Sequence, residues 1–144
     1  MSAIRTTKEL PPAVRTLSAL YLATAIAGST VALTGDYPGT PLGIDLGLTS
    51  AQGVWLGWGS GVSAPWPMLV ALALTGVAGI GPSWTLPLLG LMFATGGLAE
   101  PIFWDAGTGA LGVGIAAVVW LNVVIPVVLV GVWFRTRQRK SAEP

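Results

Sequence analysis

The sequence contains neither cysteine nor histidine. Without cysteine the chain can form no disulfide, ligate no iron–sulfur cluster and carry out no thiolate chemistry. Without histidine it lacks the commonest haem ligand, metal ligand and general base of proteins. A metal ion would need oxygen ligands or the sulfur atoms of the three methionines, which are not clustered in the sequence. The sequence therefore predicts no metal site and no cofactor.

Charge is scarce and unevenly distributed. Only 9% of the 144 residues are charged and 53% are hydrophobic, with a mean hydropathy of +0.74, whereas soluble domains carry about 25% charged residues. No lysine or arginine lies between Arg15 and Arg135. The acids of that interval are Asp36, Asp45, Glu100 and Asp105. The long apolar runs predict an integral membrane protein, and no feature beyond the basic ends points to nucleic acid.

Four apolar runs are long enough to cross a bilayer, since a span needs about 20 residues. They cover residues 14–33, 63–80, 83–104 and 108–134. The first run is longer than the core of a secretory signal, so we expect it to remain as a helix rather than be cleaved. The predicted fold is an all-α integral membrane protein, a single four-transmembrane-helix bundle over residues 1–144 with an outer loop at 35–62 and a basic tail at 135–144.

The positions of the basic residues predict the orientation. Because lysine and arginine are enriched on the cytoplasmic side, both termini are expected to be cytoplasmic, which agrees with an even number of spans in a plasma (inner) membrane. Trp84 and Trp104 are 20 residues apart, which is about 30 Å on a straight helix. We therefore expect these two rings to mark the two interfaces, and Trp133, beside the basic tail, to mark the inner interface again.

The stretch GGLAEPIFWD, residues 96–105, places an acid and a proline within the third run. Pro101 has no N–H, so the carbonyl of Gly97 loses its helical partner, and Gly96-Gly97 permits close approach of another helix. On a straight helix Glu100 lies about one turn inside the outer interface. It is then either an interfacial acid that ends or kinks the helix beside headgroup water, or a proton- or cation-responsive carboxylate.

The fourth run carries a polar residue near its middle. Asn122 is followed four residues later by Pro126, so an amide side chain and a freed backbone carbonyl coincide there. Trp120 lies nearby, away from either predicted interface. Such groups usually bond to a neighbouring helix, but they could also line a ligand site.

The segment GVWLGWGSGVSAPWP, residues 53–67, holds three tryptophans, four glycines and two prolines. Its glycines disfavour an isolated helix and its tryptophans favour the interface. It is either a surface or re-entrant segment leading into the second helix or an aromatic lid over an outward cavity. Aromatic rings near a carboxylate would suit an organic cation. The candidate ligand-binding residues are Glu100, Asn122, Trp120, Trp104, Trp58 and Asp36.

Three functions are compatible with these residues. The favoured hypothesis is a non-catalytic subunit or small-ligand-binding membrane component, for which no catalytic residue is assigned. The first alternative is an oligomeric small-molecule or cation transporter that uses Glu100 near the outer face. The second is a membrane enzyme that pairs Glu100 with Asp105, Asp36 or Asp45 in acid–base catalysis. The expected partners are the lipid bilayer, further copies of the chain or other membrane subunits, and a small hydrophobic or cationic ligand, but no nucleic acid.

Overall fold

The computed structural model describes residues 10–35, 44, 46–55, 59, 64–109 and 111–142. Within these residues the elements are all helical, as predicted. They are α1 (Pro12–Gly35), α2 (Ser50–Trp55), α3 (Trp66–Leu72), the π-helical η2 (Ala73–Val77) that continues α3, α4 (Thr85–Ala99), α5 (Pro101–Thr108) and α6 (Val113–Ala142).

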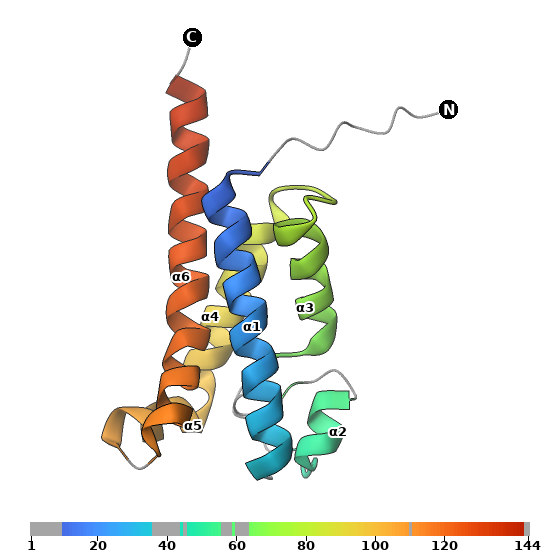
Figure 1. The fold of residues 1–144 in the computed structure, drawn as a ribbon, viewed down its shortest axis with the longest axis vertical. Helices are drawn as coiled ribbons and strands as arrows, with labels where there is room; N and C mark the ends of the chain where they lie inside the picture. Colours follow the sequence, from blue (N-terminus) through green and yellow to red (C-terminus); the bar gives the residue numbers. More distant parts are fainter. Residues whose placement is uncertain are drawn as a thin grey trace.

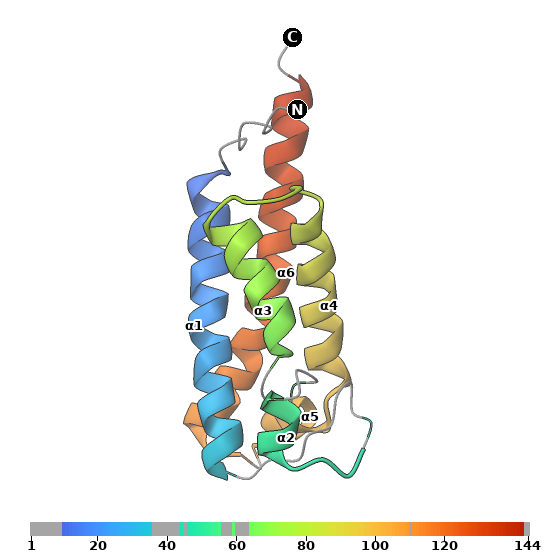
Figure 2. The same cartoon turned by 90° about the vertical axis from the view of Figure 1, so that its right-hand side faces the viewer.

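The long helices alternate in direction. α1 runs down the molecule, α3–η2 runs up, α4 runs down and α6 runs up (Figures 1 and 2), and α6 packs mainly against α1 and α4. The start of α1 and the end of α6 lie together at one end, which we call the basic end because it carries Arg15, Arg135, Arg137 and Arg139. The opposite end holds α5, with Glu100 and Asp105, and we call it the acidic end.

In the part of the chain that the structure describes, two helices are long and apolar enough to cross a membrane, namely α1 and residues 113–139 of α6. α4 and α5 make a third candidate only if they are taken together, because they meet at an angle of 64°. The predicted run 83–104 is therefore not one straight helix. The prediction of a span at 63–80 is also too long, since α3–η2 has twelve residues, roughly 18 Å at 1.5 Å per residue.

Prolines and glycines explain where these helices begin and end. α3 starts just after Pro65, with Pro67 in its first turn, and prolines are favoured there because the first N–H groups need no helical partner. Gly79 and Gly81 have φ of 72° and 108°, a region that glycine enters without steric cost, and η2 ends just before them. α5 ends at Thr108, and the next residue, Gly109, has φ of 76°.

Eight hydroxyl side chains of the helices bond to the backbone of their own helical segment. Each of these donates a hydrogen bond of 2.7 to 3.0 Å to the carbonyl three or four residues earlier. This arrangement suits helices in lipid, where water cannot serve as the partner. The residues are Ser18, Thr24, Ser29, Thr30, Thr34, Thr75, Thr95 and Thr136.

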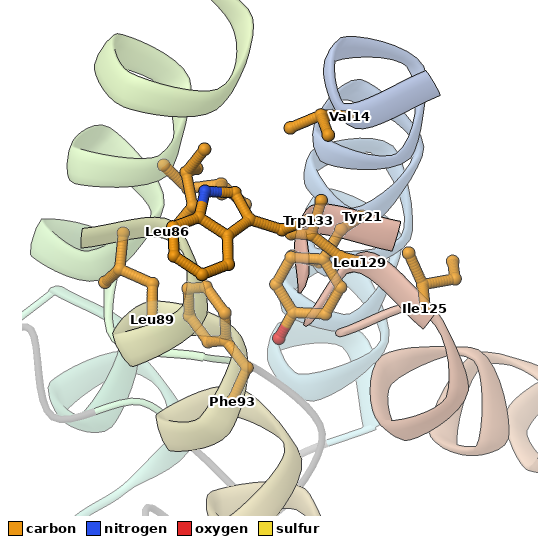
Figure 3. Packing of buried hydrophobic residues seen from close by; sticks show 10 residues of the cluster. Val14, Tyr21, Leu86, Leu89, Phe93, Ile125, Leu129 and Trp133 are labelled. Atoms are coloured by element: carbon orange, nitrogen blue, oxygen red, sulfur yellow. The ribbon is translucent and has the colours of Figure 1, made fainter. Parts of the chain in front are cut away.

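The larger hydrophobic cluster of the described residues joins α1, α4 and α6, with Leu72 of α3, toward the basic end. Tyr21 of α1 packs on Phe93 of α4 with ring centroids 4.5 Å apart. Figure 3 shows Trp133 of α6 reaching toward Leu86 and Leu89 of α4. Trp133 is only 6% exposed, so its large apolar ring packs in the helix–helix core. Its predicted depth at the inner interface stays a prediction.

Two glycines of α4 allow close packing against α6. A Cβ atom on Gly90 would lie 2.5 Å from Cγ2 of Val130, and one on Gly97 would lie 2.8 Å from Cγ2 of Val123. Small residues bring helix backbones together in membranes, where packing rather than water expulsion drives association. The expected close approach at Gly97 is therefore present, while the equivalent role of Gly90, seven residues earlier, was not predicted.

Candidate functional site

Glu100 forms the joint between two helices at the acidic end. It is the residue that follows α4 and precedes α5, with φ of −74° and ψ of 131°. This extended conformation is the one favoured before proline, and Pro101 occupies the first position of α5, where its missing N–H does no harm. The predicted role of Glu100-Pro101 in ending or kinking the third helix is confirmed, and the resulting bend is 64°.

The backbone at the joint is satisfied locally. The carbonyl of Gly97, which Pro101 deprives of its usual partner, accepts a hydrogen bond of 3.4 Å from the N–H of Glu100. The N–H of Phe103 in turn donates to the carbonyl of Glu100 at 3.1 Å. The break therefore leaves the Gly97 carbonyl with a donor, as the interior of a membrane requires.

The side chain of Glu100 is buried within the protein. It is 6% exposed, whereas Asp105, five residues later within α5, is exposed. The interpretation of Glu100 as an acid facing headgroup water does not agree with its burial. Nor do Glu100 and Asp105 share one environment, as a proton-sharing pair would need.

Aromatic rings form a connected group beside this joint. Phe103 is buried and lies three residues after Glu100. Its ring centroid is 4.7 Å from that of Trp120 on α6 and 5.3 Å from that of Trp104. The structure thus links two of the predicted site residues, Trp104 and Trp120, through a third ring that was not predicted. The signal in the sequence was the spacing of three residues between Glu100 and Phe103, which can bring two side chains to one side of a helix.

The packing of α4 on α6 shows how Glu100, Trp120 and Asn122 lie relative to one another along the long axis of the bundle. Gly90 meets Val130 and Gly97 meets Val123, so seven residues down α4 correspond to seven residues back along α6. Continuing that antiparallel register sets Glu100 level with Trp120. Asn122 is half-buried, with its side-chain Oδ1 shielded from solvent, and lies further toward the basic end. Two other predicted site residues, Trp58 and Asp36, fall outside the described residues, as does Asp45.

The joint holds one buried carboxylate, and the rings of Phe103 and Trp104 follow it within four residues of the chain. Within the described part of the chain, no three acidic, histidine or cysteine side chains are grouped so that they could hold a metal ion. A carboxylate with aromatic neighbours can attract a cation by charge and by cation–π interaction. No family model, curated protein or solved structure matches the chain.

Proposed function

We propose that the chain is a small integral membrane protein that acts as a non-catalytic subunit or small-ligand-binding component, with Glu100 as its binding group. The observation that carries this proposal is the burial of Glu100 at the α4–α5 joint. An acid buried at membrane depth is costly, and such residues commonly belong to functional sites. A non-catalytic role is favoured because the other described acid, Asp105, is exposed.

The membrane arrangement that supports this role has four helical segments with both chain ends in the cytoplasm. α1, α6 and the bent α4–α5 cross the bilayer, and α3–η2 is a shorter segment on the cytoplasmic side of its middle. The described arginines lie at one end and the described acids at the other. This separation is expected when the basic end faces the cytoplasm of a plasma (inner) membrane.

Cysteine labelling tests this orientation without background, because the natural chain has no cysteine. Gly107→Cys at the acidic end and Gln138→Cys at the basic end both introduce the thiol at exposed positions. On intact cells a membrane-impermeant maleimide is expected to label Gly107→Cys, and to label Gln138→Cys only after permeabilisation. Labelling of Gln138→Cys on intact cells would contradict the orientation.

The binding role of Glu100 is tested with tetraphenylphosphonium, a lipophilic organic cation. The Glu100→Gln variant is expected to bind the probe at least about thirtyfold more weakly, because truncating one partner of a buried charge pair costs about 2–5 kcal/mol. The matched control is Asp105→Asn, which removes an exposed carboxylate five residues away in α5 and should bind as the natural chain does. Titration of each purified protein measures the affinities, and equal binding by Glu100→Gln would exclude Glu100 as the binding group.

Transport is the second candidate, and the broken helix at Glu100 favours it. Transporters commonly bind substrate where a membrane helix is interrupted. In proteoliposomes with a proton gradient, a transporter would accumulate tetraphenylphosphonium in a way that Glu100→Gln abolishes and Asp105→Asn does not. Binding without accumulation would favour the non-catalytic binding component.

The subunit form of the proposal predicts a stable complex. Extraction from native membranes in a mild detergent should recover the chain with other membrane polypeptides at a fixed ratio. Recovery of the chain alone, as a monomer, would remove the subunit interpretation and leave the binding role to be decided by the Glu100 titration.

A further inference from the structure

The last turns of α6 extend beyond the rest of the bundle at the basic end (Figure 1). Arg135 and Arg139 are exposed there and lie four residues apart, so they occupy one face of the helix, about one turn from each other. Two guanidinium groups at this spacing can contact one phosphodiester group, since guanidinium geometry suits phosphate oxygens. Arg137 lies on a different face, with its guanidinium 4.8 Å from the ring centre of Trp133.

An apolar stripe on α6 leads directly to these two arginines. Val124, Val128 and Gly131 are exposed, and their spacing of four and then three residues continues to Arg135 and Arg139, which is the repeat of a single helix face. This stripe is opposite to the face that packs on the bundle, whose residues include Ile125, Leu129 and Trp133.

Gly131 makes a notch in this stripe. A Cβ atom placed on it would meet no other atom within 4 Å. At Gly90 and Gly97, by contrast, side chains of α6 occupy the space that a Cβ atom would take. The notch lies one turn below Arg135. A hydrocarbon chain running along the stripe would therefore meet a shallow recess at the depth where a lipid tail joins its headgroup.

We propose that this face of α6 binds an anionic phospholipid. One acyl chain lies along Val124, Val128 and the Gly131 notch, and the phosphate contacts Arg135 and Arg139. The occupant is a lipid because the stripe is apolar where the bilayer core would be and cationic where headgroups would be. Charge complementarity selects an anionic headgroup, since the described acids, Glu100 and Asp105, both lie at the opposite end.

The experiment compares lipid binding by the purified full chain in a neutral detergent. Phosphatidylglycerol is titrated and the bound lipid is counted by native mass spectrometry. The double variant Arg135→Gln, Arg139→Gln is expected to bind phosphatidylglycerol about thirtyfold more weakly, from about 1 kcal/mol for each arginine near anionic lipid. The matched control is Arg5→Gln, Lys8→Gln, which removes the same charge elsewhere and should keep the affinity.

Filling the notch tests the acyl-chain contact separately. Gly131→Leu should weaken phosphatidylglycerol binding, whereas Gly114→Leu, at another exposed glycine of α6 with no atom within 4 Å, should not. Phosphatidylcholine should bind weakly to every variant, and inorganic phosphate should not compete.

Three outcomes overturn the proposal. Equal losses in both double variants would show a response to net charge alone. Displacement of the lipid by inorganic phosphate would show an anion site rather than a lipid site. Equal binding of phosphatidylcholine and phosphatidylglycerol would show that the arginines do not select the headgroup. None of these outcomes depends on Glu100, so the proposed function is tested independently.

Discussion

Trp133→Ala is expected to lower the free energy of unfolding by about 3–5 kcal/mol. Trp133 is 6% exposed and belongs to the cluster that joins α1, α4 and α6. Its ring also lies beneath the guanidinium of Arg137. In a bilayer this lost stability comes mainly from missing packing contacts in the core. Lipid tails are as apolar as the core, so moving a side chain from lipid into the core gains little hydrophobic free energy.

The control for this prediction is Trp84→Ala. Trp84 is the same residue type but is 56% exposed at the start of α4, so its removal creates no internal cavity. Unfolding in detergent can be followed by the intrinsic fluorescence of the remaining six of the seven tryptophans. Equal destabilisation by the two variants would contradict the placement of Trp133 in the core.

Gly90→Leu is expected to separate α4 from α6 and to destabilise the protein by about 1–3 kcal/mol or more. The added Cβ would meet Cγ2 of Val130 at 2.5 Å and the carbonyl oxygen of Pro126 at 3.3 Å. A side chain can rotate away, but the backbone carbonyl moves only if the helix moves. Pro126 is itself fully buried, so α6 has little room to adjust at this point.

Gly114→Leu provides the comparison for Gly90→Leu. Gly114 is exposed on α6 with no atom within 4 Å of a Cβ atom there, and leucine has the higher helix propensity. Thermal unfolding of both purified variants measures the difference, with Gly114→Leu expected at or slightly above the stability of the natural chain. If Gly90→Leu unfolds at the same temperature as the natural chain, the close α4–α6 contact at Gly90 is wrong.

Several local features could be predicted because they depend on neighbouring residues alone. Long apolar runs predicted helices, since backbone groups in lipid must bond within their own segment. Pro101 predicted a helix end because proline lacks an N–H. These inferences need no knowledge of which helices are neighbours.

Features that depend on helix packing were predicted poorly. The straight-helix assumption between Trp84 and Trp104 put Glu100 near headgroup water, but the 64° bend and the packing of α5 bury it. The packing of Trp133 in the core between α4 and α6 was not predicted. A sequence does not reveal which side of an almost uniformly apolar helix meets another helix, since lipid and protein neighbours select similar residues.

The sequence by itself determined that this is a helical protein with apolar segments suited to a membrane, with its basic residues confined to the two ends of the chain. It also determined that a proline and an acid interrupt the third apolar run. Only the tertiary structure decided that Glu100 is buried, that Phe103 joins Trp104 to Trp120, and that Gly90 and Gly97 receive the side chains of α6. The physical reason is range: helix formation and helix ends follow from local backbone bonding, whereas burial follows from contacts between segments far apart in the chain.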